Sequence, residues 1–382
     1  MKVWQELLGQ PEAIEQLSRV VEDKNSGFQH SWLFTGPAGS GRSTLARAFA
    51  AALQCEENGC GVCTSCKLIA ADSHPDVRML VTDKVIISIE EVRQLVQFAA
   101  LGSTLGEYRI VIIEDADRMT ERTSNVLLKA LEEPQPKTVW ILCAPSAADM
   151  LPTIRSRTRN VVLRLPSIEE VAQLLIQRDG VKEELALSSA RQAQQHVGMA
   201  RRLAMSADAR KRRMDTLREL VGIKNLSGAM ATAERLLAFA KKDAESSSEE
   251  KNQQERTKLL AAYGIEDEKI PPNLRSEFRQ LEENQKRRNT RALRDGIDRI
   301  FTDMESLFRD ILSLQLGANS PLINQELAEE IELRASATTA ENSIRVLEAI
   351  STARSRLEAN VRDLVVLESL CTKLIVRSSV AA

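Results

Sequence analysis

The sequence predicts an α/β domain built on a parallel sheet, followed by a long all-α part. Between residues 31 and 165, short apolar runs alternate with amphipathic helical stretches, which is typical of a parallel sheet covered by helices on both faces. After residue 166 only helical periodicity remains. The composition agrees, because the 382 residues are 43% hydrophobic but only 3% aromatic, a mixture that favours helices packed through small aliphatic side chains.

Five apolar runs are expected to form strands and three stretches between them helices. The strands are expected at 31–34, 77–81, 108–114, 138–144 and 160–165. The helices are expected at 42–54, 88–101 and 120–133, and Ser88 with Glu91 forms a capping-box pattern at the start of the second helix. Short amphipathic helices are expected from Ser167 to about residue 206, and longer helices from there to the end.

Charge and hydropathy patterns limit the classes of function that the chain can have. The net charge is −2, so a nucleic-acid contact requires a local basic patch. The first residues lack the apolar core of a signal peptide, and no apolar run reaches about 18 residues, so we expect a soluble cytoplasmic protein without a membrane contact. Residues 241–291 carry many charges of both signs. They are expected to form a solvated helical hairpin or arm interrupted at Ile270-Pro271-Pro272, although a plain surface without its own function explains the same composition.

The stretch TGPAGSGRST (35–44) has the form of a phosphate-binding loop between a strand and a helix. In such a loop Gly36, Gly39 and Gly41 let backbone N–H groups point at an anion, and the hydroxyl residues Ser43 and Thr44 follow, with Ser43 reaching Mg²⁺. The pattern has lysine where this chain has Arg42, and the bulkier, planar guanidinium is not an equivalent replacement. A tight structural turn is the alternative interpretation.

The run IVII (110–113) ends in a second acidic motif, Glu114-Asp115. P-loop ATPases usually place Asp here for magnesium, and in many of them Glu follows to activate water. Here the order is reversed, so Glu114 is one methylene too long for the magnesium position and Asp115 is one methylene too short for the position that activates water. An error of about 1 Å can cost about 100-fold in rate. A plain acidic strand end is the alternative.

Four of the six cysteines lie within twelve residues, at Cys55, Cys60, Cys63 and Cys66. This spacing allows four thiolates to close a tetrahedron around a structural Zn²⁺ with no open coordination position. Such density indicates a metal site in a reducing compartment rather than a disulfide framework. Free thiols or an iron–sulfur cluster are the alternatives. Cys143 and Cys371 are expected to be packed.

Five features together resemble the bacterial clamp-loader subunits of the AAA+ class, in their actinobacterial form. They are HSWLFTGPAGSGRST (30–44), the cysteine module directly after the loop helix, His74-Pro75-Asp76, IVIIEDADRMTERTSNVLLKALEEP (110–134) and TIRSRT (153–158). The stretch NVLLKALEEP (125–134) is especially characteristic. The resemblance covers about residues 1–205 through specific motifs, and the remainder only through helical character and length.

The resemblance implies three domains and a ring of five subunits. A RecA-like AAA+ domain with the zinc module (55–66) would span 1–166, a helical lid 167–206, and a helical collar 207–382 with the charged insertion at about 241–291. Each ATP site in such a ring lies between neighbours, and the next subunit supplies an arginine finger from a Ser-Arg-Cys motif. Here the motif is Ser156-Arg157-Thr158, which makes Arg157 the candidate.

The resemblance also implies two sensors of the nucleotide. Arg201 matches the lid's Gly-x-x-Arg motif, whereas the polar sensor falls near Ala144-Pro145, where no polar side chain is present. The chain's own site therefore departs from the family at three places, counting Arg42 and the Glu114-Asp115 pair. ATP or ADP is expected to bind weakly, if at all. In the family, DNA is contacted by helices that correspond to those starting near Ser88 and Thr123 here. Arg93 and Lys129 could contact DNA from these helices, but they could equally be ordinary exposed charges.

Three functions follow from these patterns. The first is a ring member of the DNA polymerase III clamp loader that does not hydrolyse ATP, gives Arg157 to a neighbour, and works with γ/τ and δ subunits, the β sliding clamp and primer–template DNA. Such a chain is not an enzyme by itself but part of a polymerase (nucleotidyltransferase) holoenzyme. The second is an ATP-hydrolysing motor of the γ/τ type. The third is a stand-alone zinc module that binds nucleic acid, which the low basicity disfavours.

Overall fold

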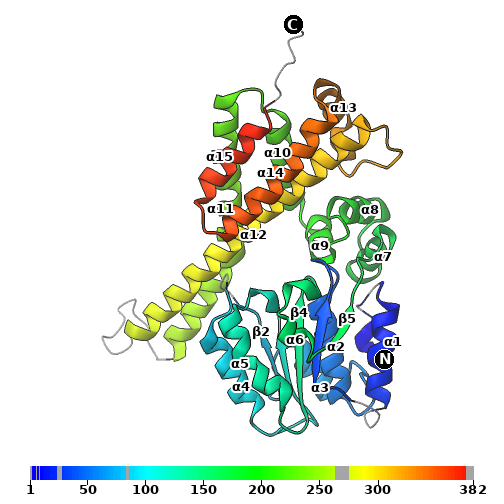
Figure 1. Cartoon of the computed structure of the whole chain (residues 1–382), viewed down its shortest axis with the longest axis vertical. Helices are drawn as coiled ribbons and strands as arrows, with labels where there is room; N and C mark the ends of the chain where they lie inside the picture. Colours follow the sequence, from blue (N-terminus) through cyan, green and yellow to red (C-terminus); the bar gives the residue numbers. More distant parts are fainter. Residues whose placement is uncertain are drawn as a thin grey trace. The chain divides into compact units, whose positions relative to one another are not determined.

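The computed structural model describes residues 2–5, 7, 9–23, 28–82, 86–262 and 275–375. The chain forms two compact units, Met1–Met205 and Ser206–Ala382. The first unit contains the sheet and the second is helical (Figure 1).

The first unit is built on five parallel strands in the order β2-β3-β4-β1-β5. The strands are β1 (Ser31–Thr35), β2 (Val77–Leu80), β3 (Arg109–Ile113), β4 (Thr138–Ala144) and β5 (Arg159–Val162). Every residue of β1, β3 and β4 is buried, which agrees with their continuous apolar sequences. The last strand differs from the prediction of a buried run, because β5 lies at the sheet edge and only Val161 of its four residues is buried.

Helices cover both faces of this sheet, as Figure 1 shows. On one face α1 (Pro11–Glu22) and α2 (Arg42–Gln54) enclose a core that includes Trp32 and Phe34. On the other, α4 (Ile89–Ala99), α5 (Glu121–Glu132) and the short α6 (Pro152–Arg155) enclose a core that includes Leu33 and Trp140. Consecutive residues of β1 point to opposite faces, as the pleat requires.

Local sequence signals set the helix ends. The predicted capping box is confirmed, because the Ser88 side chain accepts a hydrogen bond from the Glu91 N–H and the Glu91 carboxylate accepts one from the Ser88 N–H. Thr120 caps α5 in a similar way through the N–H of Thr123. These caps satisfy N–H groups that have no partner inside the helix.

Beyond residue 166 the described residues form helices joined by turns and loops, with no strand among them. In the first unit these helices are α7 (Ile168–Asp179), α8 (Glu183–Gln192) and α9 (Val197–Met205), while the short α3 (Thr64–Ala70) lies earlier, in the cysteine module. In the second they are α10 (Ala207–Val221), α11 (Leu226–Ala262), α12 (Arg275–Gln315), α13 (Ala328–Ala337), α14 (Ala340–Glu358) and α15 (Asp363–Lys373). The second unit packs around one apolar core, in which Phe301 and Leu367 are fully buried. The division into lid and collar stays a prediction.

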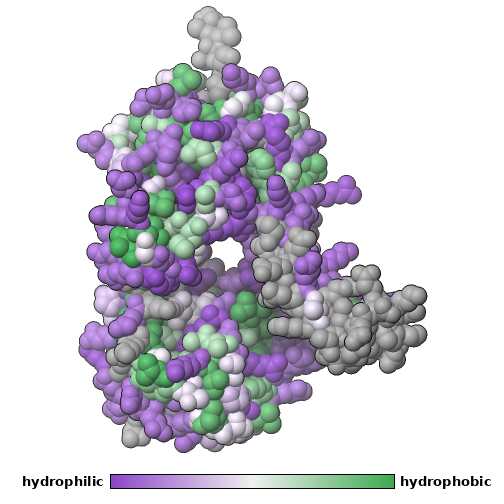
Figure 2. Space-filling view, turned by 180° about the vertical axis from the view of Figure 1, so that it is seen from behind, coloured by the Kyte–Doolittle hydropathy of each residue, from purple (hydrophilic) through white to green (hydrophobic). Residues whose placement is uncertain are grey.

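The charged segment 241–291 lies mainly in two long helices, α11 and α12, which run side by side (Figure 1). The amide of Gln285 on α12 donates to the carbonyl of Asn252 on α11 at 3.1 Å. The predicted break at Ile270-Pro271-Pro272 lies outside the described residues. Hydrophilic side chains cover most of the surface seen in Figure 2. Among the helices described, none is long and apolar enough to cross a membrane.

Candidate nucleotide and metal sites

The glycine loop lies between β1 and α2, as the sequence predicts. Gly39 and Gly41 have φ angles of +85° and +90°, which side chains other than that of glycine rarely adopt. The Gly36 N–H faces the backbone carbonyls of Ala144 and Pro145, at 3.4 and 3.1 Å. The predicted position of the polar sensor therefore does lie beside the loop, which it contacts through these two backbone carbonyls.

Arg42, the first residue of α2, turns back onto its own loop. Its Nη1 donates to the carbonyl oxygen of Gly36 at 2.5 Å, and its Nη2 lies 3.8 Å from Oδ1 of Asp115. Only 14% of the Arg42 side chain is exposed. Asp115 also pairs with Arg118 at 3.3 Å. The guanidinium is thus engaged by groups of the protein in the region where the lysine of a phosphate-binding loop would meet a phosphate.

The structure brings the reversed acidic pair to this loop. β3 ends at Ile113, and Glu114 and Asp115 follow, both half-buried, with Asp115 in the left-handed region at φ +48°. Asp117 is the third carboxyl group here, and burial raises its pKa, with a further contribution from the charge of Asp115. Burial also raises the pKa of the Cys143 thiol, as do the Glu114 and Asp115 carboxylates. Ser43 and Thr44 lie half-buried in the first turn of α2.

Two residues that the sequence analysis missed also hold the loop. A Cβ atom on Gly39 would lie 2.6 Å from the Cα of His196, so the segment between α8 and α9 packs directly on the loop. Burial lowers the pKa of His196, and the charge of Arg42 adds to this shift. The buried Gln10 amide donates to the carbonyls of Ser40 at 3.1 Å and Arg164 at 2.6 Å.

Arg201, the predicted lid sensor, pairs with a different residue. Its Nε and Nη2 lie 3.0 and 2.9 Å from Oδ1 of Asp179, the last residue of α7. The guanidinium is about half exposed. His196, just before α9, lies against Gly39 of the loop, whereas Arg201 pairs with Asp179.

Arg157 lies in the turn between α6 and β5, on the surface of the first unit. Its Nε donates to Oε1 of Glu132 at 2.6 Å, and its Nη2 forms an ion pair with the same oxygen. Its Nη1 donates to the carbonyl of Thr153 at 2.8 Å and to Oγ of Ser156 at 3.1 Å. The side chain is 34% exposed. The predicted finger is therefore ordered and remains accessible from solvent.

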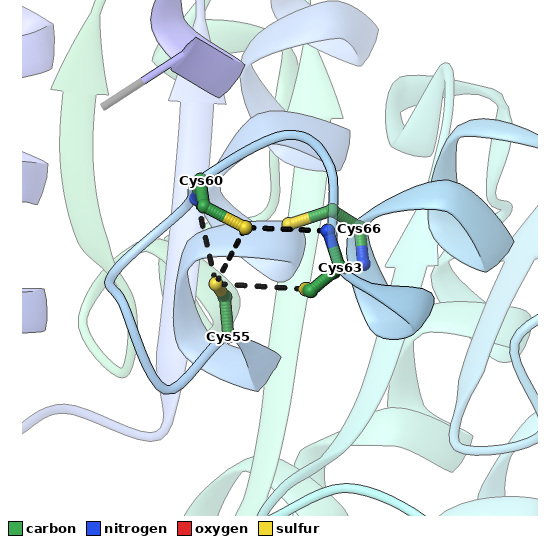
Figure 3. Close-up of side chains that lie close together, drawn as sticks. All are labelled: Cys55, Cys60, Cys63 and Cys66. Carbon is green, nitrogen blue, oxygen red and sulfur yellow. Dashed lines mark hydrogen bonds between the residues drawn. The ribbon is translucent and has the colours of Figure 1, made fainter.

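The four predicted cysteines come together in one cluster (Figure 3). Their sulfur atoms all lie within 4.8 Å of one another. Sγ of Cys55 lies 3.6 Å from that of Cys60 and 3.7 Å from that of Cys63. A tetrahedron with Zn–S distances of about 2.3 Å has S–S edges of about 3.8 Å. The cluster therefore has the dimensions of a closed four-sulfur zinc site.

Backbone N–H groups surround these sulfur atoms. The N–H groups of Cys60 and Cys63 donate to the sulfur atoms of Cys55 and Cys60, at 3.4 and 3.3 Å. Burial alone would raise the pKa of Cys55, but the N–H groups of Cys60, Gly59 and Glu57 lower it to about 7. These donors stabilise the Cys55 thiolate, the form in which cysteine binds a metal, whereas burial raises the pKa of the Cys66 thiol.

The His74-Pro75-Asp76 motif has a structural role. The carboxylate of Asp76 is fully buried and accepts hydrogen bonds, each of 2.7 Å, from the N–H groups of Thr104, Leu105 and Gly106. Nη1 of the buried Arg109 lies 2.7 Å from the same carboxylate. Burial would raise the pKa of Asp76, but these donors lower it to about 2. The motif thus fastens the loop 104–106 to the start of β3.

Comparisons with known proteins agree with this arrangement. A family model described as "DNA polymerase III, delta subunit" matches residues 9–167, and one for the C-terminal part of that subunit matches residues 278–374. The DNA polymerase III subunit delta' of Bacillus subtilis is 25% identical over 380 residues, which cover 96% of each chain. That of Pseudomonas aeruginosa is 37% identical over 171 residues, or 42% of this chain and 52% of the relative, so the chain spans about half of that relative's length.

Two further comparisons give partial or distant matches. The DNA polymerase III subunit gamma/tau of Mycobacterium tuberculosis is 32% identical over 165 residues, which cover 42% of this chain and 28% of the relative. A crystal structure of a DNA polymerase III gamma subunit-related protein from Thermotoga maritima superposes with a TM-score of 0.47 and 18% identity, over 95% of this chain and 98% of the other. The two family models and the delta' relatives together show that the chain belongs to the delta'-type clamp-loader subunits of DNA polymerase III.

Proposed function

We propose that this subunit is a ring member of the clamp loader that does not turn over ATP in its own site and that gives Arg157 to the ATP of a neighbouring subunit. The observation that carries the first half is the internal pairing of Arg42 with Gly36 and Asp115. The second half is supported by the ordered, solvent-accessible guanidinium of Arg157.

The geometry of its own loop argues against hydrolysis. For a triphosphate to bind as in a motor, Arg42 must leave both the Gly36 carbonyl and Asp115. Asp115 must then also leave Arg118 before its carboxylate can polarise a water molecule. The shorter Asp side chain at this position and the apolar Ala144 at the sensor position remove two further catalytic groups. The motor alternative draws on the gamma/tau relatives, of which that of Mycobacterium tuberculosis matches 42% of this chain.

Arg157 suits the opposite role, in which an arginine acts on a partner's nucleotide. A planar guanidinium stabilises the charge that spreads over a transferring phosphoryl group, and an arginine supplied by a second protein is worth about 10³–10⁵ in rate in analogous systems. Thr158 stands where the family has cysteine, and its hydroxyl donates to the carbonyl of Ile154 at 3.1 Å, which helps to fix the turn.

Zn²⁺ fits the cysteine cluster as a structural ion. It would join Cys55, which follows α2, to Cys63 and Cys66 at the start of α3. When bound, the ion would cross-link these elements and would not take part in catalysis, because four thiolates leave no coordination position open. ATP or ADP would bind weakly in the glycine loop, if at all, with Arg201 and the loop residues as its potential contacts.

The proposed partners are the γ/τ and δ subunits of a five-membered ring, with the β sliding clamp and primer–template DNA bound by the assembled complex. The three-domain division into AAA+ core, lid and collar belongs to the same proposal, as does a place in the cytoplasm at the replisome. The N-terminal ends of α4 and α5 are candidate phosphate contacts, because helix N-termini attract anions. Arg93 is 63% exposed and lies 3.9 Å from Glu90, so its charge is partly compensated locally.

The proposal is tested by reconstituting the clamp loader from this chain and its γ/τ and δ partners. Clamp loading should require the chain, whereas the chain alone should show no ATPase above background. Arg157→Ala should lower the DNA- and clamp-stimulated ATPase of the complex by at least about 100-fold at that neighbour's site. Arg155→Ala, at an exposed arginine two residues earlier, is the matched control. Equal ATPase rates for the two variants would refute the finger assignment, and turnover by the isolated chain that Ser43→Ala removes would establish a motor.

A further inference from the structure

Glu132 makes the shortest contacts of the candidate finger. Both Nε and Nη2 of Arg157 contact one carboxylate oxygen of Glu132. Nη1 is held by the Thr153 carbonyl and, through the longest of the four contacts, by Oγ of Ser156. Every nitrogen of the guanidinium is therefore engaged, and the plane of the group is fixed before any partner arrives.

The stability of α5 alone does not explain a carboxylate at this position. Glu132 is the last residue of α5 and Glu133 is its C-cap. A helix C-terminus carries a partial negative charge, so it favours cations and disfavours carboxylates. The Glu132 and Arg157 side chains are 45% and 34% exposed, and ion pairs between exposed groups contribute little to stability. The consequence of this pair is therefore mainly geometric.

The orientation leaves part of the guanidinium able to bind an anion. Glu132 holds the edge formed by Nε and Nη2. The end between Nη1 and Nη2 can meet a second anion, in keeping with the forked donor pattern of arginine. The 3.1 Å contact between Nη1 and Ser156 is the one that a phosphate oxygen can replace with the least rearrangement, since Glu132 and Thr153 keep their shorter contacts.

We propose that Glu132 is a positioning residue for Arg157. It holds the guanidinium on the surface in the orientation in which its Nη end can reach the phosphates of the neighbouring subunit's ATP. This inference rests on the proposed function of Arg157. Glu132 touches neither nucleotide nor partner in this scheme and acts only through the arginine.

The test uses the assembled clamp loader and its DNA- and clamp-stimulated ATPase. Glu132→Gln keeps the size of the side chain but removes its charge, so the hold on Arg157 weakens. We expect kcat to fall about tenfold with KM for ATP within about twofold of wild type, because a displacement of about 1 Å of a catalytic group costs up to about 100-fold in rate. Glu133→Gln is the matched control, since it makes the same change at the next residue of the same helix end.

A double variant separates positioning from a general structural effect. In an Arg157→Ala background, Glu132→Gln should have no further effect on kcat, because groups that act as a unit are not additive. The variants should unfold at the same denaturant concentration as wild type. If Arg157→Ala has no effect, the proposed function fails. Two outcomes would overturn the positioning inference while leaving the proposed function of Arg157 intact. In the first, Arg157→Ala lowers kcat but Glu132→Gln has no more effect than Glu133→Gln. In the second, Glu132→Gln lowers kcat by the same factor in the Arg157→Ala background as in the wild type.

Discussion

Replacing Asp76 with asparagine is expected to be among the most destabilising single-charge changes in the first unit. The change leaves the guanidinium of Arg109, which is buried, without its carboxylate at 2.7 Å. The N–H groups of Thr104, Leu105 and Gly106 would face an amide in place of a charged acceptor. Arg109 keeps its contacts with the carbonyls of Phe98 and Pro75 at 3.1 and 3.2 Å, which soften the loss.

The size of the effect follows from the pKa of Asp76. That pKa is about 2 in the folded protein, against about 3.9 in an unfolded chain. The difference corresponds to about 2.6 kcal/mol of stability above pH 4. Breaking a buried pair by removing one partner costs about 3–5 kcal/mol. Because Arg109 retains its carbonyl contacts, a loss of about 3 kcal/mol at pH 7 is expected.

The sign of the pH dependence is fixed by the lowered pKa. A carboxyl group whose pKa is depressed on folding contributes stability that is complete above its unfolded pKa and is lost as the pH falls toward the folded pKa. The contribution of Asp76 should therefore be complete at pH 5, fall by about half at pH 3, and vanish below pH 2. The gap in unfolding free energy between the wild type and Asp76→Asn should narrow over the same range.

Tryptophan fluorescence can follow this unit selectively during urea unfolding, because Trp4, Trp32 and Trp140 are the three tryptophans of the chain and all precede residue 205. Asp72→Asn is the matched control, since Asp72 forms an exposed ion pair with Arg47 at 3.0 Å that is worth about 0–1 kcal/mol. Equal destabilisation by the two variants, or a gap that stays constant between pH 5 and pH 3, would refute this account of Asp76.

Two further outcomes are expected. The purified protein should hold about one zinc per chain by elemental analysis. Cys60→Ser should lower that zinc content and make the first unit unfold at a lower urea concentration. Cys371→Ala, at a buried cysteine of the second unit, should leave the zinc content unchanged. Arg42→Lys should restore the usual loop cation but give no ATPase above background in the isolated chain, because the reversed Glu114-Asp115 pair remains. ATP turnover by this single variant would contradict this expectation, since it would show that Arg42 alone prevents hydrolysis.

The fold was largely predictable because its signals are local. The predicted helix at 42–54 and strand at 138–144 have the predicted bounds in the structure, since each carries its own apolar pattern and ends at a turn or a cap. The burial of β5 was not predictable in the same way. Val161 and Val162 suggested a buried run, but exposure depends on the strand's place at the edge of the sheet, which only the order of all five strands decides.

The candidate sites likewise include contacts that the sequence could predict and contacts that it could not. The cysteine spacing predicted a cluster, since four ligands within twelve residues need little help from the rest of the chain. The contacts of His196 with the loop and of Glu132 with Arg157 join residues that are far apart in sequence. No local pattern marks either contact, although Glu132 belongs to the characteristic stretch 125–134.

Arg42 gives a physical reason why the glycine loop persists in a subunit that we propose does not hydrolyse ATP. Lysine presents a compact charge that suits a phosphate, whereas a planar guanidinium can bond a carbonyl and a carboxylate at the same time. Arg42 does this with Gly36 and Asp115. It therefore joins the start of the loop to the end of β3 without a ligand, as Gln10 joins the loop to Arg164. Arg42 thus serves as an internal connection between the segments that follow β1 and β3.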